Sequence, residues 1–254
     1  METNNTLTQS GKDMNATTLD LMAKMRLNGM RDAFKASLNS PFAENMTPDA
    51  FIASLIGSEW DYRQEKMVAR LTKQAAFRYK AFLEDVDYTL PRGLNQNQME
   101  RLATLDFIRE NKNLLITGPS GTGKSFLGCS FGHEACKHGF RTIYANSQKL
   151  MNKLKGAKAK GTYEQEIKKI EKAQLLILDD LFLIGLDAKE RAILMDIVED
   201  RHGRKSMFIT AQIPVANWYD AIGDPTVADA ILDRLVHTAH QIELTGVSLR
   251  KTMK

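Results

Sequence analysis

The sequence predicts an α/β protein, with a parallel β-sheet covered by helices on both faces and a small all-helical domain ahead of it. The first observation is a glycine-rich loop between a short apolar run and a helical pattern at residues 113–132. The second is that strand-like and helix-like segments alternate from there to residue 244, as the crossovers of a parallel sheet require. The third is that residues 16–85 have helical apolar spacing. The expected strands are residues 113–117, 141–145, 175–178, 207–210 and 240–244.

The N-terminal region is divided by its apolar spacing and its prolines. Thr47 precedes Pro48, which predicts an N-cap followed by proline at the first helical position. Residues 1–15 are polar, so we expect a disordered tail there, then a helical domain over residues 16–90 and a second domain over residues 91–254. The linker is expected at residues 90–93, where proline and glycine interrupt the helical pattern.

The loop at residues 118–125 matches the pattern G-x-x-x-x-G-K-[ST] between a predicted strand and a predicted helix. Glycines let backbone N–H groups turn inward around an anion, and the start of the following helix adds partial positive charge. We expect Lys124 to reach the β- and γ-phosphates of ATP and the Ser125 hydroxyl to bind Mg²⁺. A chance glycine turn is the weaker alternative, because strand and helix flank the loop. The predicted ATP-binding residues are Gly118, Pro119, Ser120, Gly121, Thr122, Gly123, Lys124 and Ser125.

Two aspartates follow a buried strand-like run. Asp179 and Asp180 come directly after the apolar residues 175–178, at a strand end where parallel sheets collect ligands. Because buried carboxylates need a cation or polar partners, we expect Asp179 to bind Mg²⁺, directly or through water, and Asp180 to polarise the attacking water. The alternative is that the pair only caps the next helix. Thr210 and Gln212 follow another apolar strand, and either could hydrogen-bond the water or the γ-phosphate.

Composition and cysteine usage narrow the possible classes. With 43% hydrophobic and 26% charged residues, the chain is typical of soluble globular proteins, and no apolar run approaches the roughly 20 residues of a membrane helix. The N-terminus has no apolar signal-peptide core, so we expect a cytoplasmic protein. Cys129 and Cys136 lie on one predicted helix, too far apart for a disulfide, and we expect both to be buried. No cysteine–histidine spacing suggests zinc.

Positive charge is concentrated in two segments. Residues 61–80 contain six basic and two acidic side chains, and residues 149–172 contain eight lysines and three glutamates. Such runs are often solvated helix faces, but two of them beside a phosphate-binding loop favour an anionic polymer as partner. We expect DNA contact without sequence preference by four lysines in a flexible, glycine-flanked stretch: Lys153, Lys155, Lys158 and Lys160. The second choice is Arg63, Lys66, Arg70 and Lys73.

Together these motifs resemble those of the AAA+ ATPases. The phosphate-binding loop and the segments LLILDD, FITAQ and ADAILDRLVH occur in the order that is typical of that superfamily. Within it, the chain resembles the IstB-type helper ATPases of bacterial insertion sequences, which are related to the DnaC helicase loaders. The segments LMAKMRLNGMRDAF and AAFRYKAFLEDVDY resemble the IstB helical region, and the resemblance extends over residues 17–250.

The resemblance implies an ATP-controlled, DNA-binding homo-oligomer that holds nucleotide between its subunits and assists a transposase. It matches Arg234 to the arginine finger that reaches a neighbouring subunit's γ-phosphate; from its own pattern, Arg234 is a surface residue or pairs with Asp233. Two departures are that Asp180 stands where many AAA+ members have glutamate, and that no room remains for a C-terminal lid domain. A DnaC-like helicase loader is the main alternative. A small-molecule kinase and a non-hydrolysing scaffold fit the residues less well.

Overall fold

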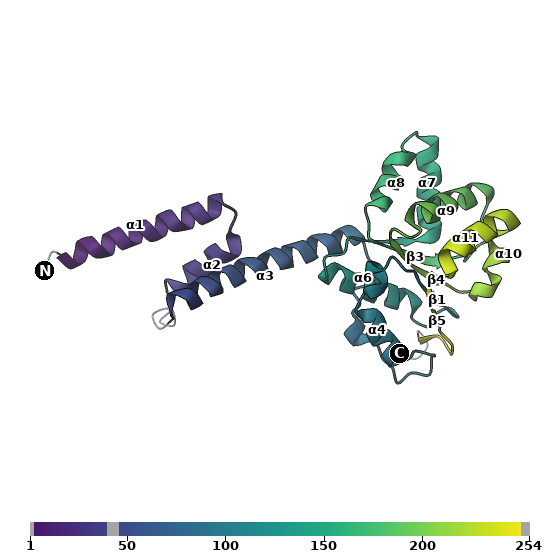
Figure 1. Cartoon of the computed structure of the whole chain (residues 1–254), viewed down its shortest axis with the longest axis horizontal. Coiled ribbons are helices and arrows are strands. Elements are labelled where there is room, and N and C mark those ends of the chain that lie inside the picture. The colour runs from purple at the N-terminus through teal and green to yellow at the C-terminus, as the bar shows by residue number, and fades with distance from the viewer. Residues whose placement is uncertain (1–2, 40–45, 250–254) are drawn as a thin grey trace. The chain divides into compact units, whose positions relative to one another are not determined.

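The computed structural model describes residues 3–39 and 46–249, and the chain divides into two compact units, Met1–Ala69 and Arg70–Lys254 (Figure 1). We call them the helical unit and the sheet unit. The helical unit comprises α1 (Thr3–Lys24), α2 (Asn28–Ser37) and most of α3 (Pro48–Ala75). The proline expected to open a helix is the first residue of α3.

Close packing joins α2 to α3. A Cβ atom on Gly29 would lie 2.3 Å from the carbonyl oxygen of Ser58, so a larger residue would force the helices apart. The Met30 amide donates a hydrogen bond of 3.1 Å to Glu59, whose other carboxylate oxygen accepts from Arg63 at 2.7 Å. The helical unit is therefore held together by a close approach of α2 and α3 at Gly29 and by the buried Glu59 carboxylate, both oxygens of which accept hydrogen bonds.

Two boundaries of the N-terminal region differ from those expected. Helix α1 begins at Thr3, where the sequence predicts a disordered tail through residue 15; the segment contains no proline, so nothing in it stops the helix from extending toward the N-terminus. The division between the units falls after Ala69, inside α3, and not at residues 90–93. The reason is burial: Ala81 is fully buried and Val86 belongs to the core of the sheet unit, so residues 70–90 pack with that unit.

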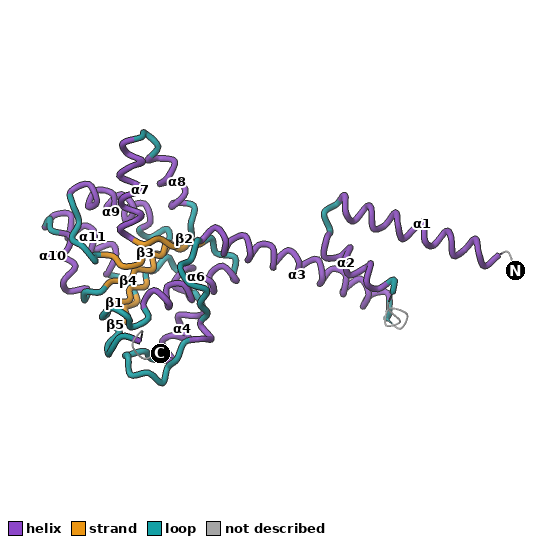
Figure 2. The backbone as a smooth tube through the Cα atoms, turned by 180° about the vertical axis from the view of Figure 1, so that it is seen from behind, coloured by secondary structure: helices purple, strands orange, loops and turns teal. Residues whose placement is uncertain are grey.

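The sheet has five parallel strands in the order β2-β3-β4-β1-β5 (Figure 2). They are β1 (Leu114–Thr117), β2 (Thr142–Asn146), β3 (Leu175–Leu181), β4 (Ser206–Ala211) and β5 (His240–Glu243). Each overlaps a strand predicted from the sequence. Strands β1, β3 and β4 are apolar and buried on both faces, as the central strands of a covered parallel sheet must be.

Helices cover both faces of the sheet, as predicted. One core cluster contains side chains of α7 (Ser147–Ala159), α8 (Tyr163–Glu171), α9 (Ala188–Arg201), α10 (Trp218–Ile222) and α11 (Pro225–Val236). The other cluster contains side chains of α4 (Gln96–Ala103), α5 (Asp106–Arg109) and α6 (Lys124–Lys137). Short 3-10 turns lie at Leu83–Asp85 and Val215–Asn217. Among the described helices, none is long and apolar enough to cross a membrane.

Two local expectations for the helices have different outcomes. Cys129 and Cys136 are free and fully buried on α6, as predicted. The stretch around Gly156, expected to be flexible, is instead part of α7, which extends to Ala159 before a turn at Gly161. Apolar side chains at Leu150, Leu154 and Ala157 have helical spacing and anchor this helix in the core, which outweighs the low helix propensity of one glycine.

Candidate functional site

The candidate site lies at the edge of the sheet where the parallel strands end. The glycine-rich loop follows β1, the aspartates end β3, and Thr210 lies near the end of β4. Since β4 lies between β1 and β3, the three strand ends bring loop, carboxylates and hydroxyl to one edge. This is the edge at which open parallel sheets bind ligands.

The glycine-rich loop has a backbone that only glycine tolerates at several points. Gly118, Gly121 and Gly123 have φ values of 140°, 85° and 98°, and Gly123 caps the N-terminus of α6. The Thr122 hydroxyl donates to the Pro119 carbonyl at 2.9 Å and closes the turn. The loop therefore places the positive end of a 14-residue helix beside consecutive backbone amides, which suits a bound phosphate.

Lys124 is held close to the loop. It is buried, with 5% of its surface exposed, and its Nζ donates to the carbonyl oxygens of Gly118 and Pro119 at 2.7 and 2.8 Å. These neutral acceptors give the ammonium group polar partners within the loop itself. A phosphate oxygen is a stronger acceptor for an ammonium group than a carbonyl, so the same side chain is suited to an anion inside the loop.

Two segments far away in the sequence support the loop from outside. A Cβ atom on Gly118 would lie 2.2 Å from the Leu244 carbonyl oxygen, and the Leu249 amide donates to the Gly121 carbonyl at 2.9 Å. Arg92 is 5% exposed and donates to the Thr122 carbonyl at 3.2 Å. Burial lowers the pKa of Arg92, although the nearby Asp87 opposes this shift.

Asp179 is fully buried and hydrogen-bonded on both oxygens. The Tyr144 hydroxyl donates to Oδ2 at 2.5 Å, and the Thr210 hydroxyl donates to Oδ1 at 2.7 Å. Arg78 Nη1 lies 4.0 Å from Oδ2. Burial, and then the bond to Asp179, raise the pKa of Tyr144 far above its usual value, so the phenol remains a donor. The carboxylate is fixed in orientation and keeps lone pairs for a further cation or water.

Asp180 has a different environment. Its backbone is in the left-handed region at φ 58°, which is uncommon for a non-glycine residue, and its amide donates to the Thr210 hydroxyl at 2.9 Å. Its side chain is partly exposed and, among the described residues, has no hydrogen bond or ion pair. Such backbone strain is frequent at functional sites.

The two sensor candidates from the sequence separate here. The Thr210 hydroxyl bridges Asp179 and the Asp180 amide, so its hydrogen is already donated to a carboxylate. Gln212 lies just beyond β4, is partly exposed, and makes no side-chain hydrogen bond within the part of the chain that the structure describes. The geometry therefore favours Gln212 as the group available to a ligand and Thr210 as a positioning residue.

ATP and Mg²⁺ fit the residues present. The glycine loop would hold the phosphates, and Ser125, in the first turn of α6, is at the position from which a hydroxyl reaches a phosphate-bound Mg²⁺. Asp179 offers oxygen ligands, which Mg²⁺ prefers, in a buried position 4.0 Å from the Arg78 guanidinium. The described residues contain no cluster of three or more histidine, cysteine or acidic side chains that could hold a metal ion.

Arg234 lies near the N-terminal end of β1, whereas the glycine loop follows the C-terminal end of that strand. It is on α11, and its Nε pairs with Glu199 at 2.7 Å; the partner is not Asp233, the acid considered from the sequence. Asn113, which directly precedes β1, donates to the carbonyls of Arg234 and Leu235 at 3.4 and 3.1 Å. Because the glycine loop follows β1 and Asn113 precedes it, Arg234 lies at the opposite end of that strand from the loop.

The four lysines expected to contact DNA are largely occupied. Lys153 pairs with Glu166 at 2.7 Å, and Lys155 pairs with Glu190 at 2.7 Å and Asp187 at 3.1 Å. Lys158 lies 3.6 Å from Asp196 and over the ring of Tyr163. Lys160 alone among the four has no carboxylate partner in the described residues. The lysine-rich sequence is therefore mainly an ion-paired helix surface.

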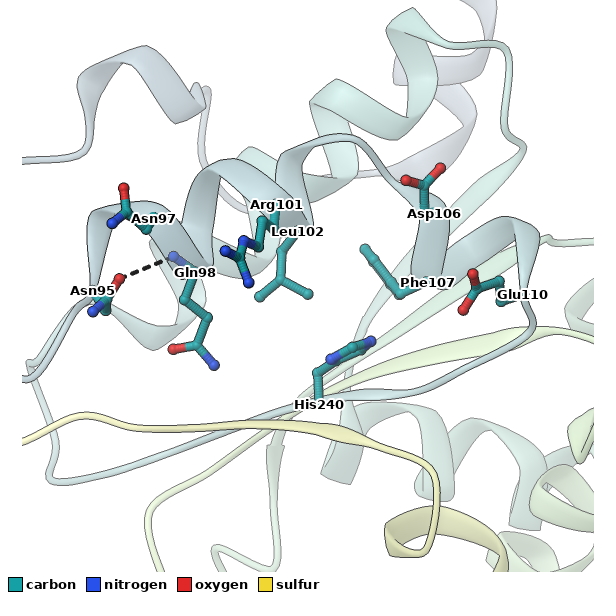
Figure 3. A pocket seen from close by; sticks show the side chains of 9 residues that line it. All are labelled: Asn95, Asn97, Gln98, Arg101, Leu102, Asp106, Phe107, Glu110 and His240. Carbon is teal, nitrogen blue, oxygen red and sulfur yellow. Dashed lines mark hydrogen bonds between the residues drawn. The ribbon is translucent and has the colours of Figure 1, made fainter.

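A separate cavity of about 680 Å³ lies between α4, α5 and the start of β5 (Figure 3). His240, the first residue of β5, lines this cavity. The cavity therefore lies at the N-terminal ends of the strands, opposite the glycine loop. Its polar side chains have local roles: Asn95 accepts from the Gln98 amide and caps α4, while Asp106 pairs with Arg109. We therefore place the candidate site at the glycine loop.

Sequence patterns missed three residues of the site: Arg78, Arg92 and Tyr144. Tyr144 lies on a strand predicted correctly, but only the parallel register, which pairs Asn146 with Asp179, brings its hydroxyl to the carboxylate. Arg78 was included only in a basic run, and Arg92 only in the linker. The proline–arginine–glycine sequence at residues 91–93 is a weak signal that could have identified Arg92 as structurally fixed.

Comparison with known proteins shows the same family over most of the chain. The model of the IstB-like ATP binding protein family matches residues 20–254. A protein of Sinorhizobium fredii that is named as an insertion sequence ATP-binding protein is 41% identical over 237 residues, covering 93% of this chain and 97% of that protein. A similarly named protein of insertion sequence IS1162 from Pseudomonas fluorescens is 34% identical, covering 79% of this chain and 87% of that protein.

Solved structures show the same fold. The DnaC helicase loader has a TM-score of 0.53 and 22% identity, covering 65% of this chain and 97% of the loader chain. DnaI has a TM-score of 0.57 and 21% identity, covering 70% of this chain and 94% of the DnaI chain. These matches confirm the predicted parallel-sheet AAA+ fold, and helices α1, α2 and α3 form the predicted helical region ahead of it.

Proposed function

The chain belongs to the IstB-like ATP-binding family, and from this premise we propose that it hydrolyses ATP and assists a transposase on DNA. The observation that carries the proposal is the carboxylate pair near the end of β3. Asp179 is buried and fixed by two hydroxyls, and Asp180 is partly exposed and has no side-chain partner among the residues that the structure describes. A fixed carboxylate beside a free one suits a division between holding a cation and accepting a proton.

Each residue has a role in this proposal. Backbone amides of the glycine loop and the start of α6 bind the phosphates, and Lys124 transfers its hydrogen bonds from loop carbonyls to phosphate oxygens. Ser125 and Asp179 hold Mg²⁺, which supplies charge neutralisation for the phosphates. Asp180 accepts a proton from the attacking water, and Gln212 orients that water or the γ-phosphate.

In this proposal, a neighbouring subunit supplies an arginine that the nucleotide site of a single chain lacks. Arg234 lies at the opposite end of β1 from the glycine loop, so it cannot reach the nucleotide of its own chain. We propose that it acts on the nucleotide of a neighbouring subunit in a homo-oligomer, after leaving Glu199. Its guanidinium would stabilise the charge on the transferred phosphoryl oxygens.

The proposal is tested by four activities of the full chain: ATP binding, ATP hydrolysis, DNA binding and stimulation of strand transfer. Lys124→Ala is expected to abolish ATP binding, and Asp180→Asn is expected to retain ATP binding but hydrolyse it about 10²–10⁴-fold more slowly, as loss of a general base does. Asp220→Asn, at an exposed aspartate of α10, is the matched control. Duplex DNA should bind to the wild-type chain, and ATP with the chain should raise strand transfer by the transposase of the same insertion sequence.

Some results would contradict the proposal. Wild-type ATP affinity of Lys124→Ala would refute the phosphate-binding role of the loop. If strand transfer is unchanged while the chain places a replicative helicase on single-stranded DNA, the helicase-loader function replaces the transposition function and the ATP chemistry remains.

A further inference from the structure

The edge strand β2 is open on one side. It is first in the sheet order, and within the described part of the chain β3 is the one strand that pairs with it (Figure 2). Beside it lies a groove of about 1060 Å³, lined by residues of the end of α3, the segment 76–78, β2, α7 and α8. All of these residues belong to the sheet unit. The groove is distinct from the glycine loop, which follows the fourth strand in the sheet order.

The groove is strongly cationic. The charged side chains that line it are Arg78, Arg141, Lys149, Lys153, Glu166 and Lys169. Glu166 pairs with both Lys153 and Lys169, at 2.7 and 2.6 Å. Over residues 3–39 and 46–249, no carboxylate lies within 4.0 Å of the cationic groups of Arg141 or Lys149. The groove therefore carries positive charge that the described part of the protein does not neutralise.

One end of the groove reaches the carboxylate of the candidate site. Arg78 and Tyr144 both line the groove, and both also face Asp179 Oδ2, at 4.0 and 2.5 Å. The Arg78 side chain is 48% exposed, whereas that of Asp179 is fully buried. Arg78 is thus the group through which a charge in the groove can act on the buried carboxylate.

Resting on the proposed function, we propose that this groove binds the phosphate backbone of one DNA strand, and that a phosphate there draws Arg78 away from Asp179. Guanidinium and ammonium groups donate hydrogen bonds that phosphate oxygens accept. Among the described residues that line the groove, Tyr144 is the one aromatic residue, and its hydroxyl is bonded to Asp179. We therefore expect contact with the DNA backbone and not base stacking. DNA binding would then alter the rate of ATP hydrolysis through Arg78.

An extended acidic peptide that adds to β2 is the competing occupant. The charge pattern favours DNA, because the cations continue beyond the groove. Arg70 is exposed and lies one helical turn before Gln74, on the face of α3 that lines the groove. A DNA strand extends past both ends of a groove of this size and would meet such a residue, whereas a peptide paired with a five-residue strand would not.

Duplex DNA of random sequence is the probe for the groove. Binding of the full chain is measured by fluorescence anisotropy over a range of salt concentrations for Arg141→Ala combined with Lys149→Ala. The slope of log K against log salt should become shallower by about 1.8, and affinity at 0.15 M salt should fall about 30-fold, because two phosphate contacts are lost. Arg204→Ala combined with Lys189→Ala removes the same charges from exposed positions outside the groove, and should change neither quantity comparably.

The link to Asp179 has its own measurement. Arg78→Gln should lower DNA affinity at 0.15 M salt only about 5-fold, with a slope shallower by about 0.9, but the ATP hydrolysis rate should no longer respond to DNA. Arg204→Gln should keep the response of the wild-type chain. Thermal unfolding of every variant verifies that the exposed substitutions leave the fold intact.

The outcomes separate this inference from the function on which it rests. No DNA binding by the wild-type chain overturns both. Wild-type binding that the groove variant retains, with an unchanged salt slope, overturns the groove alone. Tight binding of an alternating Glu-Val peptide that Arg141→Ala with Lys149→Ala abolishes, while DNA binding persists, assigns the groove to a peptide and overturns the inference. A DNA response that survives in Arg78→Gln overturns the role of Arg78.

Discussion

The Thr210 hydroxyl joins the two carboxylate residues, and its removal is a sharp test of the site's architecture. Thr210→Val keeps the shape of a fully buried side chain but loses the bond donated to Asp179 at 2.7 Å and the bond accepted from the Asp180 amide at 2.9 Å. A hydrogen bond to a charged group contributes about 1.5–3 kcal/mol and a neutral one about 0.5–1.5 kcal/mol. We therefore expect the free energy of unfolding to fall by about 2–4.5 kcal/mol.

The matched comparison is Thr210→Ser, which keeps the hydroxyl and removes one buried methyl group, at a cost of about 1 kcal/mol. Urea unfolding of the full chain, followed by circular dichroism, should rank stability as wild type, then Ser, then Val. ATP hydrolysis should fall more in the Val variant, because Asp179 and Asp180 lose their common anchor. A Val variant as stable as the Ser variant would refute the bridging role of the hydroxyl.

Three further predictions follow from the geometry. Mixing Lys124→Ala and Arg234→Ala chains should restore part of the ATP hydrolysis if Arg234 acts between subunits, and no recovery after confirmed co-assembly would exclude this. Gly132→Ala should destabilise the fold by about 1–3 kcal/mol, because its Cβ would lie 2.3 Å from the Phe77 ring, whereas Gly156→Ala on open α7 should stabilise it by up to about 1 kcal/mol. Burial raises the pKa of Glu190, but the hydrogen bonds from Lys155 and the Asp187 amide outweigh burial and lower this pKa below 4.5. The stability that this carboxylate contributes is therefore present above pH 4.5 and is lost as the pH falls through the lower pKa of the folded state. Acid titration of unfolding should show this loss in the wild type and not in Glu190→Gln.

Local patterns in the sequence were sufficient to predict the glycine loop and the succession of strands and helices along the chain. The loop is recognisable because strand, glycines and helix are adjacent in sequence, and each signal is local. The same holds for Asp179 and Asp180, which follow an unbroken apolar strand. These elements were predicted within a few residues because burial on both faces imposes a continuous apolar run.

What the sequence could not provide depends on contacts between distant residues. Lys155 appeared to be a free cation, but it pairs with Glu190, 35 residues away. Ala81 appeared to belong to the helical region, and only packing against the sheet unit buries it completely. The roles of Tyr144 and Arg78 likewise depend on the register of β2 with β3, which no local signal determines.

Asn113 joins the end of α11, the helix that carries Arg234, to the start of β1, the strand that leads to the glycine loop. Its amide nitrogen donates to the end of the helix that carries Arg234, and its side-chain oxygen accepts from the Met207 amide at 2.9 Å, at the start of β4. The glycine loop begins only five residues later, at Gly118, after a strand that spans about 13 Å. In a head-to-tail oligomer, one subunit's loop would face one interface and its Arg234 the next. A shift of β1 at one interface would then move Arg234 at the other interface. In such an oligomer, β1 would couple the nucleotide sites of successive subunits.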